Sequence, residues 1–204
     1  MVRCEPGASA DSVPYVYDAA ATAMTSVSAA TDALGGPEAS PEEFRAALGQ
    51  LASGVVLVTA HDPEEGPRGE DIGMTATAFL SVSLEPPMVL VSVREDSRME
   101  EILSRVDRFA VSVLAADQRT TAARFAMKGR VSDRLLFAEV PHTRGAASGA
   151  PLVTGALATV ECRTVDRIPA GDHILVLGHV LQARVGTPTG GPLVYFRGQY
   201  RHLG

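Results

Sequence analysis

The chain has 204 residues, of which 46% are hydrophobic and 21% charged, which is typical of one globular domain with a sizeable core. Its formal net charge of -6 argues against a nucleic-acid partner, because such a surface needs a basic face. No apolar run approaches the roughly 18 residues of a membrane helix, and the first residues lack a signal-peptide pattern, so we expect a cytoplasmic protein without a membrane partner. Cys4 and Cys162 are too few for a disulfide framework or a zinc site, and we expect no metal.

Residues 1–40 are rich in Ala, Ser and Thr and carry no strand pattern. A thin apolar stripe would fit a helix, but the composition favours a disordered or loosely packed extension. The predicted domain, residues 41–204, begins with a strong helix start, in which Ser40 is the N-cap and Glu43 completes a capping box. The apolar face of this helix comprises Phe44, Ala47, Leu48 and Leu51.

The most informative stretch is DIGMTATAFLSVSLE, residues 71–85, which has the period of one long β-strand. Its even positions, from Ile72 to Leu84, are all apolar, whereas the odd positions between them carry Gly, Thr, Ser and one Phe. No charge occurs between Asp71 and Glu85, so the polar face is not patterned for exposure to water. Two interpretations fit: a surface that a flat ligand approaches closely and bonds to, or a Thr- and Ser-rich barrel strand.

The neighbouring segments also favour strands. Residues 55–60 read as a buried strand and residues 61–70 as a hairpin loop, in which His61 is a loop residue rather than a ligand. Proline cannot donate to a β-ladder, so Pro86 and Pro87 end the long strand, and residues 88–94 form another. A short helix is predicted over residues 99–105, and the segment Asp96, Ser97 and Arg98 before it either holds a phosphate or supplies an ordinary N-cap.

A strand at residues 108–114 and a helix from Asp117 to about Lys128 follow. Thr121, Arg124, Phe125 and Lys128 share one face of this helix. Arg124 and Lys128, four residues apart, repel each other, and no acidic residue between Gln118 and Ser132 separates them. A bound phosphate would remove the repulsion; alternatively, the cations simply complement the helix dipole. Lys128 is the only lysine of the chain.

The remaining segments complete the fold. Residues 131–149 read as a polar loop with a short apolar interruption, and residues 152–165, 174–185 and 193–196 as strands. The whole predicts a mainly β protein with peripheral helices, a six- or seven-stranded antiparallel barrel. The Rossmann, P-loop, zincin and α/β-hydrolase motifs are all absent from the sequence.

Several segments in order resemble the flavin reductase family, the FMN-binding split barrels that serve two-component flavin-dependent monooxygenases. They are GMTATAFLSVSLEPPMVLVSV, ARFAMK (residues 123–128), AGDHILVLGHV (170–180) and PLVYFRGQY (192–200). The resemblance runs from about Phe44 to Tyr200. It implies a split β-barrel homodimer that passes a hydride from NADH, or NADPH, to FMN or FAD and supplies reduced flavin to a separate monooxygenase. Because the flavin carries the chemistry, the protein needs no catalytic triad.

The resemblance also assigns residues to the site. It places Thr75, Ala76 and Thr77 along the ribityl chain and the isoalloxazine edge, Ser81 and Ser83 near the ring, and Ser92, Val93, Arg94, Ser97 and Arg98 toward phosphate or adenine. Arg124, Phe125 and Lys128 would close the phosphate end. Gly171, Asp172 and His173 resemble the nicotinamide-side turn, with His173 as the catalytic candidate, although by sequence alone they are a turn before a strand. Tyr200 either reaches the nicotinamide pocket or packs against the barrel.

The sequence alone leaves alternatives open for the flavin and for the function. The resemblance is nearest to the reductases that serve aromatic polyketide oxygenases, which favours FMN over FAD. A flavin-binding sensor or storage protein without turnover is the rival function, and a split barrel for pyridoxal phosphate or haem is a third. The resemblance does not cover the N-terminal extension.

Overall fold

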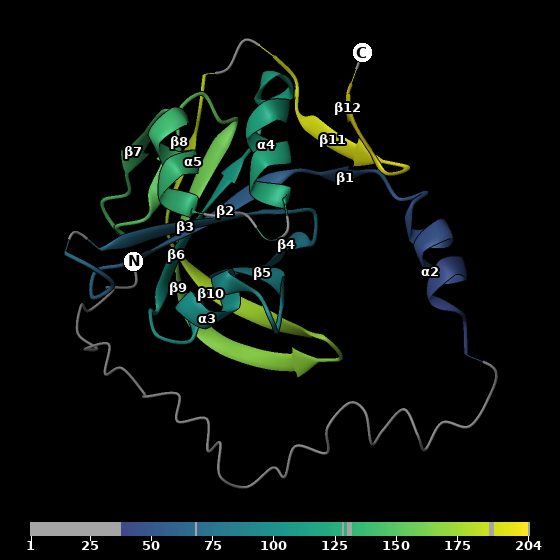
Figure 1. Ribbon diagram of the computed structural model, residues 1–204, viewed down its shortest axis with the longest axis horizontal. Helices are drawn as coiled ribbons and strands as arrows, with labels where there is room; N and C mark the ends of the chain where they lie inside the picture. The colour runs from purple at the N-terminus through teal and green to yellow at the C-terminus, as the bar shows by residue number, and fades with distance from the viewer. Residues whose placement is uncertain (1–37, 68, 128, 130–131, 188–189, 204) are drawn as a thin grey trace, which may run out of the picture.

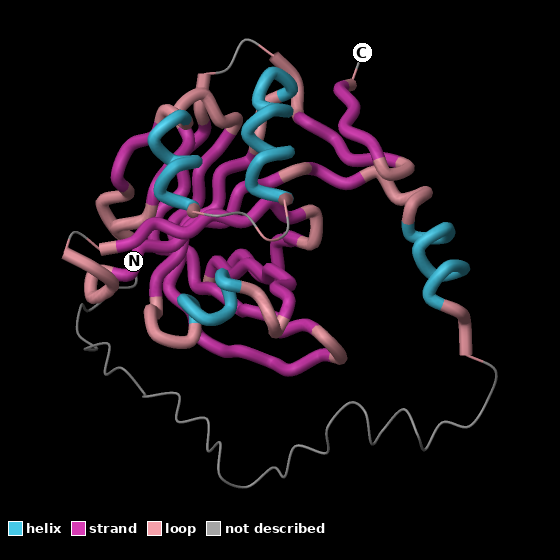
Figure 2. Tube along the Cα trace, viewed as in Figure 1, coloured by secondary structure: helices cyan, strands magenta, loops and turns pink. Residues whose placement is uncertain are grey.

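The computed structural model describes residues 38–67, 69–127, 129, 132–187 and 190–203, and Figures 1 and 2 show their arrangement. Lys128 and residues 1–37 of the predicted extension lie outside this part. None of the described helices is long and apolar enough to cross a membrane.

The described elements are mostly strands. The helices are α2 (Pro41–Leu48), α3 (Arg98–Leu103), α4 (Arg119–Ala126) and α5 (Asp133–Glu139), with a 3-10 turn η1 (Ala116–Gln118) before α4. The strands are β1 (Ser53–Gly54), β2 (Val56–Asp62), β3 (Glu70–Ala76), β4 (Phe79–Leu84), β5 (Pro87–Arg94), β6 (Arg108–Val113), β7 (His142–Arg144), β8 (Pro151–Val153), β9 (Ala158–Ala170), β10 (His173–Val185), β11 (Leu193–Phe196) and β12 (Gln199–His202).

Seven strands form one antiparallel sheet in the order β3-β2-β6-β9-β10-β5-β4, which confirms the predicted mainly β fold. The strands β3 and β4 are consecutive in the chain, yet they lie at opposite edges of the sheet. Only Thr77 and Ala78 connect them, so the sheet must curl until its two edges meet at this pair of residues. The hydrogen-bond ladder does not close between these edges, and the barrel is split at this point.

The core explains why β2 is apolar at almost every position. Val56, Val58 and Ala60 point into one hydrophobic cluster, together with β3, β5, β6, β10 and α3. Val55 and Leu57, on the other face, join a second cluster beneath α4 and α5. A strand buried on both faces loses the alternation of apolar and polar residues. Figure 1 shows α4 and α5 side by side over β3, where both helices contact that strand.

The structure corrects five predictions about elements. The long strand over residues 71–85 is two strands, and after the break its even positions are exposed rather than buried. The predicted polar loop over residues 131–149 contains α5 and β7, and the strand over 152–165 is divided between β8 and β9. His61 lies within β2, where its Nδ1 is 2.8 Å from Asp71 Oδ1. Asp117 is not the N-cap of α4, because it lies inside the 3-10 turn that precedes this helix.

The capping box at the start of α2 is confirmed. The Ser40 hydroxyl accepts from the Glu43 amide at 3.2 Å, and the Ser40 amide donates to the Glu43 carboxylate at 2.9 Å. The Ser40 amide and the Ser40 hydroxyl both donate to the Glu43 carboxylate, and these two bonds hold the pKa of Glu43 below its ordinary value. The predicted apolar face of the helix, however, is not buried by any of the described residues.

Candidate functional site

A cavity of about 840 Å³ opens where the barrel is split. Its walls come from five places: Met74 to Ala78 on β3 and the β3–β4 junction, the end of β5, the start of α3, the end of α4 together with Gly129, Ser132 and Asp133, and His173 on β10. Segments far apart in the sequence therefore meet here. The volume lies within the roughly 300–1,000 Å³ that small-molecule and cofactor sites occupy.

The β3–β4 junction is the central wall of this cavity. The Ala78 carbonyl accepts the Ser92 amide at 3.0 Å, which ties the junction to β5. The Thr75 hydroxyl donates to the Ala122 carbonyl at 2.7 Å, so it fixes α4 to β3 and keeps its lone pairs as acceptors. Thr77 is exposed at the split and lines the cavity. The wall thus offers hydroxyl and backbone groups without a charge.

Gly73 lies on the strand face that the sequence predicted for the close approach of a flat ligand, but it serves a different purpose. A Cβ atom at this position would lie 2.6 Å from Cε1 of Phe125 and 3.1 Å from Cζ of Phe137. Glycine is therefore required for the close approach of α4 and α5 to β3, rather than for the approach of a ligand. Phe125 is 1% exposed, and its ring centroid lies 4.9 Å from that of Phe137. The pair anchors the helices that carry the outer wall of the cavity.

Arg94 and Arg98 line the cavity, and carboxylates hold both of their guanidinium groups. Arg94 forms a bidentate pair with Asp96, through Nε at 2.9 Å and Nη2 at 2.8 Å. Arg98 bonds to Glu70 at 3.0 Å, to Glu101 at 2.7 Å, and to Glu65. An anion that enters the cavity must therefore compete with these carboxylates for the two arginines.

The carboxylates around Arg98 differ in protonation tendency. The hydrogen bond from Arg98 holds the pKa of Glu65 below its ordinary value. Burial raises the pKa of Glu70, and a hydrogen bond with Glu65 raises it further. Of Glu65 and Glu70, Glu70 is thus the one that protonates first on acidification.

Ser97 is the N-cap of α3, the second of the two alternatives for this segment. Its hydroxyl accepts from the Glu100 amide at 3.2 Å and donates to the Arg94 carbonyl at 2.7 Å. Ser97 still lines the cavity, but its hydroxyl proton is already used.

His173 lies at the far side of the cavity, as the first residue of β10. A two-residue loop, Gly171 and Asp172, joins β9 to β10, and Gly171 has a φ of 66°, as a tight hairpin turn of this length requires. The Asp172 carboxylate is 2.7 Å from His173 Nδ1, and this hydrogen bond holds the pKa of Asp172 below its ordinary value. The pair orients the imidazole, although both side chains are partly exposed.

Other assigned residues do not line the cavity within this chain. Arg124 pairs with Glu139 of α5 at 2.5 Å, a partner that the sequence pattern did not reveal. Val93 is fully buried in the core, and Tyr200 packs against Tyr195 with ring centroids 5.4 Å apart. Burial raises the pKa of Tyr200. The remaining residues outside the lining are Ser81, Ser83, Gly171 and Asp172.

Sequence reasoning missed several lining residues, among them Glu70 and the buried Asp133. Glu70 directly precedes the stretch from Asp71 that was singled out, so its position there was the available signal. Asp133 had none, because α5 was taken for a loop.

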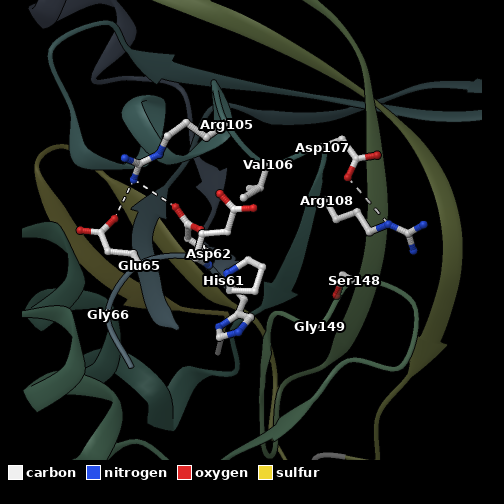
Figure 3. A pocket seen from close by; sticks show the side chains of 12 residues that line it. His61, Asp62, Glu65, Gly66, Arg105, Val106, Asp107, Arg108, Ser148 and Gly149 are labelled. Atoms are coloured by element: carbon white, nitrogen blue, oxygen red, sulfur yellow. Dashed lines mark hydrogen bonds and ion pairs between the residues drawn. The ribbon is translucent and has the colours of Figure 1, made fainter. Parts of the chain in front are cut away.

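A second cavity, of about 880 Å³, lies by the β2–β3 hairpin and is drawn in Figure 3. Its wall is charged, and several of its charges are paired with one another. Arg105 forms ion pairs with Asp62 at 3.1 Å and with Glu65 at 2.6 Å (Figure 3). The Asp71 carboxylate bonds to both His61 and Arg144. These bonds fasten the hairpin to α3 and β7, so we interpret the second cavity as structural.

Comparisons with known proteins agree with this geometry. Residues 48–204 match the family model described as flavin reductase like domain. An NADH-dependent flavin reductase from a Rhodococcus species is 40% identical over 169 residues, which cover 82% of this chain and 89% of that protein. The reductase component of 4-hydroxyphenylacetate 3-monooxygenase from Thermus thermophilus is 40% identical over 162 residues, 79% of this chain and 96% of its own.

Solved structures give the same result. The NADH:FAD oxidoreductase SgcE6 of Streptomyces globisporus, in complex with NAD and FAD fragments, matches with a TM-score of 0.72 and 35% identity, covering 83% of this chain and 98% of that one. Sequence and fold therefore agree over the same part of the molecule, and the chain belongs to the flavin reductase family.

Proposed function

We propose that this flavin reductase binds FMN or FAD, together with NADH, in the cavity at the split of the barrel. The observation that carries the proposal is the uncharged wall at Thr75, Thr77 and Ala78, where hydroxyl and backbone groups face a cavity of cofactor size beside His173. When bound, the flavin accepts a hydride from NADH and supplies the redox chemistry, so the protein has to provide binding and orientation.

Different residues of the cavity lining suit different parts of the flavin. The hydroxyls of Thr75, Thr77 and Ser92 suit the polar edge of the flavin ring and the ribityl chain. Arg94 and Arg98, at the start of α3, are the described cations of the lining, and they suit a phosphate that exchanges with their carboxylate partners. Arg124, Phe125 and Lys128 stay assigned to the phosphate end, with Lys128 outside the described residues.

His173 is proposed as the nicotinamide-side residue, held by Asp172 through Nδ1, which leaves Nε2 for the cofactor. Gly171 and Asp172 then act by positioning this side chain. Tyr200 and the serines of β4 do not line the cavity within this chain, so their assignment requires a contribution from a second chain.

Relatives of this chain are reductase components of monooxygenases, and a monooxygenase is accordingly the partner for reduced flavin. We propose that the chain works as a homodimer in the cytoplasm, and that the released flavin diffuses to a separate oxygenase. The apolar side chains of β4 support the homodimer, because Leu80, Val82 and Leu84 are 51%, 47% and 83% exposed in the single chain.

A steady-state assay tests this function. NADH oxidation is measured by absorbance with FMN, FAD or riboflavin as acceptor, and NADPH replaces NADH in a parallel series. We expect turnover with NADH and either FMN or FAD, under air and with cytochrome c as a sink for reduced flavin. Stoichiometric flavin that stays bound through purification, with no NADH oxidation, would instead indicate a storage or sensor protein.

A further inference from the structure

The helix α2 is an arm that the described part of the chain leaves uncovered. None of its residues is buried, and Phe44 and Leu48 on its apolar face are 59% and 49% exposed. Leu51, three residues after the helix ends, is 62% exposed. Figure 1 shows the helix standing apart from the large sheet. Isolated helices shorter than about 12 residues are marginal in water, and α2 has eight residues, so this helix needs a surface to pack against.

The arm is fastened at its base alone. The Arg197 amide donates to the Gly49 carbonyl at 3.0 Å, and Arg197 Nε donates to Gln50 Oε1 at 2.9 Å. Both bonds follow the last residue of α2, in the described part of the chain, and tie it to the turn between β11 and β12. They fix the direction of the arm away from the sheet of its own chain, as Figure 2 also shows.

The chain carries a second apolar surface that matches the arm. The strand β4 is an edge of the seven-stranded sheet, and its exposed residues Leu80, Val82 and Leu84 form an apolar strip without a charge. An apolar free edge is an aggregation hazard unless it is covered. Apolar, uncharged surface is also what the centre of a subunit interface requires.

We propose that α2 is an exchanged arm, whose Phe44, Leu48 and Leu51 face packs on the β4 strip of a second copy of this chain. The arm and the β4 strip belong to one chain but stand apart in it. In a dimer with a twofold axis, each arm packs on the β4 strip of the other chain, so the same contact forms twice and the interface is isologous. This inference rests on the homodimer proposed above and names the segment that builds it.

The arm also bears on the flavin cavity. The β4 strip begins directly after Thr77 and Ala78, the wall at the split. An arm from the partner copy on this strand would hold the junction from outside, so each cavity would depend on the other chain. Loss of the arm contact should therefore weaken flavin binding as well as the dimer.

Charge variants of the full chain test the contact. Leu48→Asp places a carboxylate on the apolar face, and Ala46→Asp adds the same charge to the opposite side of α2 as a matched control. Sedimentation velocity should show the dimer dissociation constant raised at least about tenfold by Leu48→Asp and left within about twofold by Ala46→Asp. An unchanged dimer in Leu48→Asp would overturn the exchanged arm.

Cross-linking identifies the occupant. In a Cys4→Ser background, Leu48→Cys combined with Val82→Cys should give a disulfide-linked dimer on a non-reducing gel, and Ala46→Cys with Val82→Cys should not. A disulfide within one chain, or no cross-link from a stable dimer, would contradict the arm and leave the homodimer standing. A monomeric wild type would contradict both. Deletion of residues 1–37 should leave the dimer unchanged. If the dimer were lost on this deletion, residues 1–37 rather than α2 would be the segment that covers the β4 strip.

Discussion

The two cavities have nearly the same volume, about 840 Å³ and 880 Å³, but different walls. In the cavity by the β2–β3 hairpin, Arg105 is matched by Asp62 and Glu65, and His61 by Asp71. At the split of the barrel the central wall is uncharged, and hydroxyl and backbone groups face the opening. Size therefore does not identify a site, whereas polar groups with bonding capacity left over do.

The two cavities share one charged network. Glu65 lines the hairpin cavity and Arg98 the split, and the two side chains are bonded to each other. The start of α3 thus separates the hairpin cavity, where Arg105 is paired, from the cavity at the split, where the central wall is uncharged.

Phe125→Ala should lower the free energy of unfolding by about 3–5 kcal/mol, because the ring is fully buried against Phe137 and Gly73. The outer wall of the flavin cavity should loosen with it, so flavin affinity falls as well. Chemical denaturation and flavin titration measure the two effects. Leu135→Ala, at a 65% exposed position of α5, is the control and should change stability by less than about 0.5 kcal/mol.

Gly73→Ala should cost about 1–3 kcal/mol, since the added Cβ would lie 2.6 Å from the Phe125 ring. Combining it with Phe125→Leu should cost less than the sum of the two single changes, because the smaller side chain gives way. Gly54→Ala, where nothing lies within 4 Å of the new Cβ, should be nearly neutral in the same denaturation experiment. Equal costs at the two glycines would refute the close approach of α4.

His173→Ala should reduce kcat for NADH oxidation about tenfold while changing the flavin dissociation constant less than about twofold. His61→Ala is the matched change in the hairpin cavity. It should leave kcat and flavin affinity near wild type and cost about 1 kcal/mol of stability through the lost bond to Asp71. If His173→Ala weakened flavin binding as much as turnover, its nicotinamide role would be refuted.

Glu70→Gln should alter the pH dependence of stability. Burial raises the folded-state pKa of Glu70, so the proton is bound more tightly in the folded chain. Its stabilising contribution is present below the unfolded-state pKa and is lost as pH rises through the folded-state pKa. Relative to wild type, the variant should therefore gain stability between acid and neutral pH, as followed by urea unfolding. A difference between Glu70→Gln and wild type that is constant at every pH would contradict the assigned direction.

Features that depend on neighbouring residues in the sequence were predicted correctly. The capping box at Ser40 and Glu43 and the strand at β5 follow from neighbouring residues alone, and both are present. The break at Thr77 and Ala78 was missed because the period of two runs through it unbroken, and neither Gly nor Pro marks it. What ends β3 there is the closure of the curled sheet, a tertiary constraint.

The charges of the site could not be assigned from sequence for the same reason. Arg98 is bonded to Glu70 and Glu65, which lie 28 and 33 positions earlier, and Arg124 to Glu139, 15 positions later. No spacing rule links such pairs. Thr75, Thr77, Ser92 and His173, by contrast, were singled out and do line one cavity, because the family segments that carry them were recognisable.

The most direct measurement is flavin binding after each cavity is filled in turn. Thr77→Trp places an indole at the split, and Glu64→Trp places one at the hairpin cavity, both from exposed positions. Flavin fluorescence titration should show the dissociation constant raised at least about 100-fold by Thr77→Trp and unchanged by Glu64→Trp, with both variants folded by circular dichroism. Flavin that binds Thr77→Trp normally, or that is lost only in Glu64→Trp, would contradict the assignment of the site.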